Sequence, residues 1–135
     1  MAEASIVAGV AFSHPRTTAS HACSFPLTNI YGLPHGEACA FTLDYFLKFN
    51  AERADGDGRI TALAKDCGFN DAFEMADEIT AMKKRMGMRC TLSEIGCETD
   101  EQIDELTKKS MSMLMTRNPI TLTQKDIKEM YIKLK

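Results

Sequence analysis

The sequence predicts an all-α fold, a helical bundle formed by a single domain over residues 1–135. Apolar residues recur at helical spacing in several segments of helical length, and no segment shows the alternating pattern of a β-strand. Capping residues stand before several of these segments. The chain is also long enough to bury one core, and its hydrophobic content of 44% and charged content of 26% are ordinary for a globular protein.

The expected helices cover residues 3–13, 17–28, 36–50, 59–67, 70–86, 100–115 and 124–134. Pro15 separates the first two, because a proline ring and its missing N–H disfavour a helix interior. Pro26 predicts a kink or an early stop of the second helix, followed by a loop over residues 29–34. Gly9 costs the first helix about 1 kcal/mol relative to alanine, and we therefore expect it to permit close packing against another helix.

The second half of the chain carries recognisable helix starts. Asn70 or Asp71 can cap the helix over 70–86, Thr99 or Asp100 can begin the next, and Thr123 with Asp126 resembles a capping box before the last.

The segment 53–59, RADGDGR, is the clearest linker of the chain. Asp55 and Asp57 fall at the offsets of a calcium-binding EF-hand loop. That template also requires an acidic residue at Arg53 and a bidentate glutamate at Ala64, so it fails at both positions. A charged turn before a helix is the better interpretation.

Charge is unevenly distributed. Residues 1–50 contain only five charged side chains, namely Glu3, Arg16, Glu37, Asp44 and Lys48. The first third of the chain is therefore expected to be largely buried, in this domain's core or against something else. An uncovered part of it would form an exposed apolar patch and favour self-association.

Composition also limits the partners and the compartment. The net charge of −3 offers no attraction to nucleic acid or to an anionic membrane, and no apolar run is long enough to span a bilayer. The apolar N-terminus lacks the basic region of a signal peptide. The cysteines are odd in number and form no Cys-x-x-Cys pair, which favours a reducing, cytoplasmic compartment over a disulfide framework. They are Cys23, Cys39, Cys67, Cys90 and Cys97.

The stretch HACSFPLTNIYGLPHG, from His21 to Gly36, holds two of the three histidines. His21 lies in an apolar helical pattern, and His35 lies in a Pro-His-Gly turn that opens the next helix. Neutral imidazole is the commonest protein ligand for a transition metal, and this spacing allows both rings to meet. The alternative is one packed core histidine and one capping histidine. Cys39 can face the same pocket but is not predicted as a ligand.

Several motifs resemble the iron-containing, metal-dependent (group III) alcohol dehydrogenases along the whole chain. They are VAGVAFSH at 7–14, LPHGEACAFTL at 33–43, LSEIG at 92–96 and RNPITLTQKDI at 117–127. The resemblance implies that the bundle corresponds to the C-terminal part of the helical domain shared by these enzymes and dehydroquinate synthase.

The resemblance also implies a chemistry. In the family an aspartate and three histidines hold a divalent metal, Fe²⁺ or Zn²⁺, and His21 and His35 match the last two of these ligands. The metal polarises the oxygen of a small alcohol or aldehyde while hydride passes to or from NAD(H) or NADP(H). The other two ligands and the cofactor domain come from family segments that this sequence does not contain. No cofactor-binding or catalytic residue is therefore assigned here.

Two functions are compatible with a sequence that lacks the other two metal ligands and the cofactor domain. The first is an alcohol dehydrogenase or aldehyde reductase that is active only when an N-terminal half completes it, so that the isolated chain is inactive. The alternative is a non-catalytic helical remnant, or an interaction module, that binds metal weakly through two neutral ligands.

The segment RTTASHACSF is more similar to the branch of the family that includes phosphonoacetaldehyde reductases. Arg16 with Thr17 and Thr18 then implies an anchor for an anionic aldehyde, because a guanidinium binds phosphonate or carboxylate in bidentate geometry. Alternatively, Arg16 faces solvent and the threonines cap a helix. Phe25 occupies the position where many members have a further histidine, and a phenyl ring cannot transfer a proton.

Overall fold

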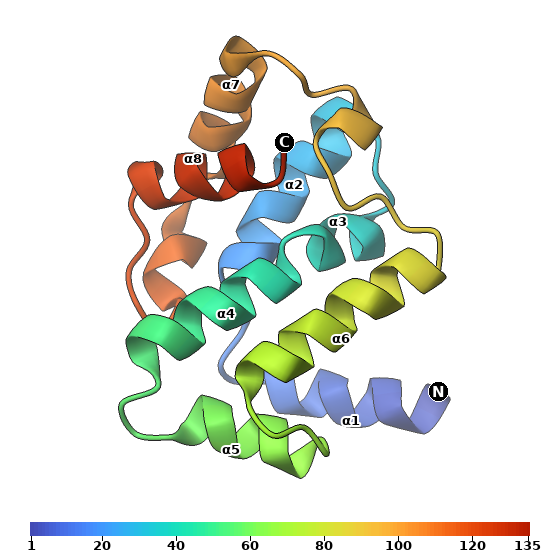
Figure 1. Cartoon of the computed structure of the whole chain (residues 1–135), viewed down its shortest axis with the longest axis vertical. Coiled ribbons are helices and arrows are strands. Elements are labelled where there is room, and N and C mark those ends of the chain that lie inside the picture. The colour runs from blue at the N-terminus through green and yellow to red at the C-terminus, as the bar shows by residue number, and fades with distance from the viewer.

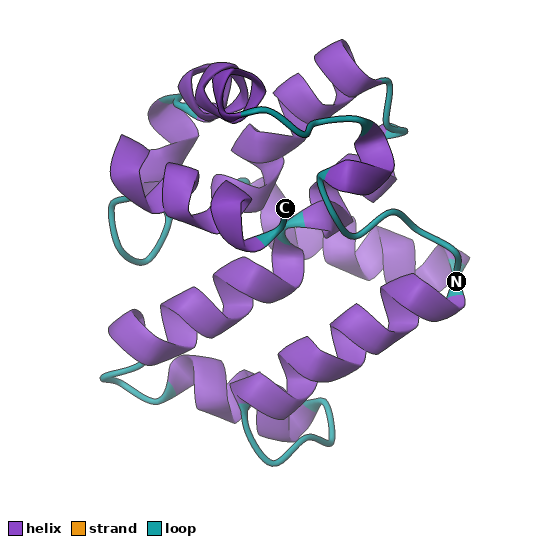
Figure 2. Cartoon of the chain, turned by 45° about the horizontal axis from the view of Figure 1, so that its top comes forward, coloured by secondary structure: helices purple, strands orange, loops and turns teal.

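The computed structural model describes residues 1–135 and consists of helices and loops without a strand (Figures 1 and 2). The α-helices are α1 (Ala2–Ser13), α2 (Ala19–Tyr31), α3 (His35–Phe41), α4 (Leu43–Ala54), α5 (Arg59–Asp66), α6 (Ala72–Arg85), α7 (Asp100–Ser110) and α8 (Gln124–Lys133). Two short 3₁₀ helices, η1 (Ser93–Ile95) and η2 (Met113–Arg117), complete the chain. The predicted all-α class is confirmed.

Helix α2 is the centre of the bundle and contacts α3, α4, α7 and η2. Its buried face carries Cys23 and Leu27, which join the core formed with α3, α4, α7 and α8. Within that core the Tyr131 hydroxyl and the Ser110 hydroxyl are 2.7 Å apart, so neither buried polar group is left without a partner. Burial raises the pKa of the nearby Cys23 thiol to about 11.

Helices α4, α5 and α6 form the lower part of the molecule in Figure 1, with α6 lying along α4. The residues expected to form one helix over 36–50 form two, because the helix breaks at Thr42 (φ −110°, ψ 4°). At the break the Phe41 carbonyl accepts a hydrogen bond from the Lys83 ammonium of α6, at 3.2 Å. A buried side chain thus satisfies a carbonyl at the end of α3.

Other boundaries also differ from the predicted ones, and α4 ends at Ala54 rather than near residue 50. Pro26 does not stop α2, which continues to Tyr31 and ends at Gly32 (φ 69°), whose N–H bonds the preceding carbonyls. Helix α7 ends at Ser110 rather than near residue 115. Ser112 there adopts an extended conformation and caps η2 through the Leu114 N–H.

The predicted helix starts are confirmed at three positions. Asp71 accepts hydrogen bonds from two N–H groups of α6, and capping boxes form at Thr99 and Thr123. Asp55 accepts from the N–H groups of Ile60 and Thr61 at 2.7 and 3.0 Å, which makes the segment before α5 the charged turn that the sequence predicts.

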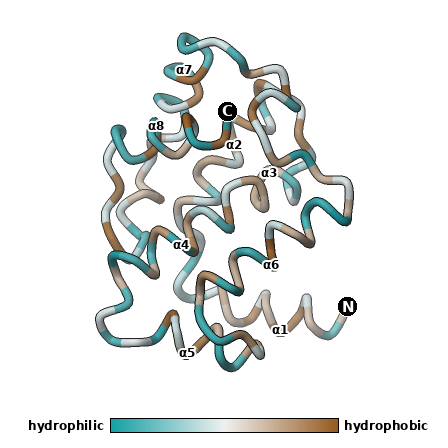
Figure 3. The backbone as a smooth tube through the Cα atoms, in the orientation of Figure 1, coloured by the Kyte–Doolittle hydropathy of each residue, from teal (hydrophilic) through white to brown (hydrophobic).

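Helix α1 has no buried residue, and it extends along one edge of the molecule (Figures 1 and 3). The exposed fractions of Ile6, Val7 and Val10 are 68%, 62% and 70%. The expectation of close packing at Gly9 is wrong here, because a Cβ at that position would meet nothing within 4 Å. Within the first third of the chain, which has few charges, the residues that join the core therefore come from residues 19–50.

None of the helices combines the length and the apolar character that crossing a lipid bilayer requires.

Candidate functional site

The site lies where the start of α3 meets the first turns of α2. The chain leaves α2 at Gly32 and is anchored by Leu33, whose side chain is buried. Pro34 then precedes His35, the first residue of α3. This return places the His35 ring 4.9 Å from the His21 ring, centroid to centroid, at an interplanar angle of 89°. The two histidines converge, as their spacing predicts.

Ser24 links the two histidines. Its hydroxyl donates to the His21 carbonyl at 2.7 Å, and its Oγ lies 3.5 Å from His35 Nδ1. Because the hydroxyl hydrogen is already used, Oγ serves His35 as an acceptor and favours the tautomer with the proton on Nδ1. The lone pair of His35 Nε2 is then free.

Cys39 completes a cluster of three donor groups. Its Sγ lies 3.5 Å from His21 Nδ1 and 3.6 Å from His35 Nε2, and the three donor atoms are all within 4.8 Å of one another. His35 is exposed, whereas His21 and Cys39 are half-buried. From the sequence, Cys39 was expected near this pocket but was not predicted to be a metal ligand. The available signal was its position four residues after His35, one turn along the same helix face.

The environment of His21 favours the neutral imidazole. Partial burial lowers the pKa of His21 below its ordinary value of 6.5, and the neighbouring His35 lowers it further. Neutral imidazole is the form that binds a metal ion.

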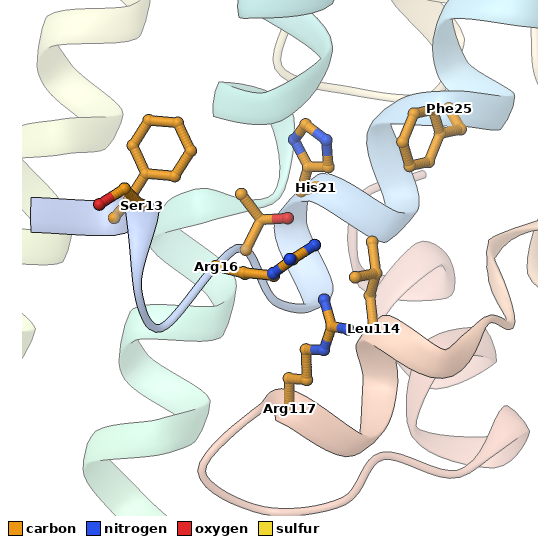
Figure 4. Close-up of a pocket in the computed structure, with 8 residues that line it drawn as sticks. Ser13, Arg16, His21, Phe25, Leu114 and Arg117 are labelled. Carbon is orange, nitrogen blue, oxygen red and sulfur yellow. The ribbon is translucent and has the colours of Figure 1, made fainter. Parts of the chain in front are cut away.

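A pocket of about 660 Å³ opens beside His21 (Figure 4). Its walls come from the end of α1, the segment before α2, α2 itself and η2. The lining residues are Phe12, Ser13, Arg16, Thr17, His21, Phe25, Leu114 and Arg117. Figure 4 shows the guanidinium groups of Arg16 and Arg117 extending toward the same region below His21.

Arg16 and Arg117 differ from the other arginines of the chain in having no ion pair. The chain has six arginines, and Arg53, Arg59, Arg85 and Arg89 each pair with a carboxylate. Arg16 and Arg117 form no ion pair, and both are exposed. The two arginines without an ion pair are thus the two that line the pocket with His21, which makes the pocket suited to an anionic ligand.

The substrate residues predicted from the sequence line two neighbouring pockets, and Arg16 and Thr17 line both. Arg16, Thr17 and Phe25 line the larger pocket, and Phe25 packs edge-on against His21 at 4.9 Å between ring centroids. Thr18 lines a neighbouring pocket of about 400 Å³ that also borders Cys39. The alternative that the threonines cap α2 is not supported, because Thr18 occupies the N-cap position without a side-chain capping bond.

Arg117 was missed as a site residue. It belongs to the RNPIT segment, which the sequence indicated only as a tail motif, and it reaches the pocket because η2 packs against α2. A contact across about 100 residues of chain has no local signature, so nothing in the sequence signalled that Arg117 lines this pocket.

Known proteins match this chain along almost its whole length. Residues 1–134 match the family model described as Fe-containing alcohol dehydrogenase family, C-terminal. Among curated proteins, an alcohol dehydrogenase of Thermococcus barophilus is 30% identical over 95% of this chain and 34% of its own length. A 1-propanol dehydrogenase of Salmonella typhimurium is 31% identical over 84% of this chain and 32% of its own length.

Two solved structures share the fold. A sulfoacetaldehyde reductase from Bifidobacterium kashiwanohense, solved in complex with NAD⁺, is 48% identical with a TM-score of 0.91, over 98% of this chain and 34% of that one. An iron-containing alcohol dehydrogenase from Thermococcus thioreducens is 26% identical with a TM-score of 0.72, over 88% of this chain and 32% of that one. The chain thus spans about a third of the length of the relatives it matches. With a match over almost every residue, the chain belongs to the Fe-containing alcohol dehydrogenase family and contains its C-terminal helical region.

Proposed function

We propose that this chain is the metal- and substrate-binding part of an NAD(P)-dependent reductase that converts a small anionic aldehyde to its alcohol, and the reverse. The observation that carries the proposal is the pair of unpaired arginines, Arg16 and Arg117, in one pocket with His21. A pocket for a neutral alcohol has no need of two uncompensated cations.

The donor set fits the divalent metal that the family implies. His21 and His35 present their ring nitrogens to a common point, and Ser24 orients the second ring. We infer that these two histidines hold the ion, Fe²⁺ or Zn²⁺. When bound, such an ion supplies Lewis-acid polarisation of a carbonyl oxygen.

The other pocket residues then have separate roles. Arg16 and Arg117 bind the anionic end of the substrate through charge-assisted hydrogen bonds. Because His21 lines the same pocket, that anchor holds the aldehyde end near the histidine pair. Phe25 covers one side of His21 and limits the access of water, but it cannot accept or donate a proton.

Sulfonated aldehydes are the first substrates to test. The relative at 48% identity is named as a sulfoacetaldehyde reductase. A sulfonate presents three oxygens to the arginine pair, as a phosphonate does, and a carboxylate presents two. A sulfonate carries one negative charge at neutral pH, so the same anchor accommodates it at lower desolvation cost than a doubly charged phosphonate.

The test uses this chain in a complete enzyme, made by fusing it to the N-terminal two thirds of the Bifidobacterium sulfoacetaldehyde reductase. Arg16→Ala and Arg117→Ala are each expected to lower kcat/KM for sulfoacetaldehyde by about 10- to 100-fold, mainly through KM. With propanal, a neutral aldehyde of similar size, the change should remain within about threefold.

Arg59→Ala provides the matched control, because Arg59 is an exposed arginine that pairs locally with Asp57 away from the pocket. It should leave both substrates unaffected. Equal losses on sulfoacetaldehyde and propanal in the Arg16 and Arg117 variants would show that these arginines are structural and would refute an anionic substrate.

The 135-residue chain by itself is expected to be inactive. It supplies two histidines of the family's metal site and none of the glycine-rich loops that bind a dinucleotide phosphate. Measuring NADH oxidation with the isolated chain and with the fusion protein, at equal metal content, tests this expectation directly.

A further inference from the structure

We propose that Cys39 is a third ligand that this chain supplies to the metal, so that the chain offers a His₂Cys donor set that prefers Zn²⁺ to Fe²⁺. The inference rests on the proposed function only in that His21 and His35 hold the ion. It assigns a role to a thiol that the resemblance leaves without one.

The distances between the sulfur and the two ring nitrogens support this ligand set. A tetrahedral ion with bonds of about 2.0 Å to nitrogen and 2.3 Å to sulfur holds these donor atoms about 3.5 Å apart. Cys39 Sγ lies 3.5 Å from His21 Nδ1 and 3.6 Å from His35 Nε2. Both sulfur–nitrogen separations therefore already equal those that a shared ion requires.

The nitrogen–nitrogen separation is less constrained. An ion of this size places two nitrogen ligands about 3.3 Å apart, whereas the donor atoms of the cluster lie within 4.8 Å of one another. His35 is exposed and can turn about its side-chain bonds, so a modest rotation brings its Nε2 closer without moving the backbone.

The local fold keeps the thiol in place. Cys39 follows His35 by one turn of α3, and side chains four residues apart lie on the same helix face. Ala38 and Phe41 of the same helix are fully buried, which fixes the rotation of α3 about its axis. The Ser24 contact at His35 Nδ1 leaves Nε2 as the nitrogen that faces the thiol.

Ligand chemistry then determines the preferred metal. Thiolate is a soft donor that suits Zn²⁺, while Fe²⁺ gains less from it, and Zn²⁺ already binds more tightly than Fe²⁺ to most donor sets. On binding, the S–H bond breaks, the sulfur retains the electron pair as a thiolate, and the proton leaves to solvent. No oxidant or reductant takes part.

The test is a Co²⁺ titration of the 135-residue chain followed by absorption, because cobalt replaces zinc and reports its ligands. The unmodified chain should show a thiolate-to-cobalt charge-transfer band in the near ultraviolet with visible bands of tetrahedral intensity. Cys39→Ser and Cys39→Ala should lose the charge-transfer band. Both should bind Zn²⁺ at least about tenfold more weakly, with Fe²⁺ affinity changed by less than about threefold.

Cys67→Ser is the matched control, because Cys67 is a free, exposed cysteine outside this cluster and should leave the band intact. Circular dichroism checks that each variant keeps its helices. If His21→Ala abolishes Co²⁺ binding and the unmodified chain lacks the charge-transfer band, the histidine site stands and Cys39 is not a ligand. A band that survives in the Cys39 variants would equally overturn the inference, and a chain that binds no metal would remove both the inference and the histidine site.

Discussion

The ammonium of Lys83 on α6 lies 2.7 Å from Asp44 Oδ1 on α4, and only 3% of the Lys83 side chain is exposed. The same ammonium donates to the Phe41 carbonyl, and Thr80 donates to the second oxygen of Asp44. One buried cation therefore joins α6 to both helices that flank the break at Thr42.

Removing one member of this pair should be strongly destabilising. Lys83→Met leaves the Asp44 carboxylate with an uncompensated charge, and we expect it to lower the free energy of unfolding by about 3–5 kcal/mol. Urea denaturation followed by circular dichroism measures the loss. The double variant Lys83→Met with Asp44→Asn should recover part of it, and a double variant no more stable than the single one would show that the ion pair itself is not responsible.

A second ion pair makes stability depend on pH. Glu37 accepts from the backbone N–H and from two side-chain nitrogens of Arg89, at 2.8 to 2.9 Å. These hydrogen bonds lower the pKa of Glu37 from 4.5 to about 2. Because the folded-state pKa is the lower one, the contribution to stability is complete above pH 4.5 and is lost as the pH falls from 4.5 toward 2.

Solvent reaches this pair, so we expect a contribution of about 1–2 kcal/mol. Glu37→Gln should remove that amount at pH 7 and make the stability of the chain less sensitive to pH between 4.5 and 2. Thermal unfolding at a series of pH values provides the comparison. Parallel curves for the variant and the unmodified chain would contradict the assignment.

Helix α1 is expected to cause self-association of the isolated chain, because Ile6 and Val10 lie exposed on one helix face. The double variant Ile6→Glu with Val10→Lys replaces them by an i, i+4 ion pair that maintains helicity. Sedimentation velocity at several concentrations should show association of the unmodified chain and a monomer for the variant. If the unmodified chain is a stable monomer and binds no hydrophobic dye, the prediction is wrong.

Ser24 is expected to act as a positioning residue for His35. Ser24→Ala removes the acceptor for His35 Nδ1, and loss of such an outer hydrogen bond should weaken Zn²⁺ binding by about tenfold. Isothermal calorimetry measures the affinity, and Ser20→Ala, on the same helix but without a hydrogen bond to either ring, is the control. Equal affinities of the two variants would exclude this role for Ser24.

The sequence predicted the helical class and most helix starts, because capping residues such as Asp71 and Thr123 act locally. It did not predict the break at Thr42, where Lys83 of the distant helix α6 donates to the Phe41 carbonyl. The approach of His21 and His35 could be predicted from their spacing, because the loop that joins α2 to α3 is short. Arg117 could not be placed, because η2 reaches the pocket only through tertiary packing.

Arg16 is the only non-glycine residue with a positive φ, at 64°. That left-handed conformation costs an L-residue about 1–2 kcal/mol relative to glycine. At this position, folding and anion recognition therefore favour different residues: Arg16→Gly should raise the melting temperature of the chain while removing one of the two pocket cations. A selection for thermal stability alone would be expected to discard this arginine, whereas a selection for growth on an anionic substrate would retain it in spite of the strain.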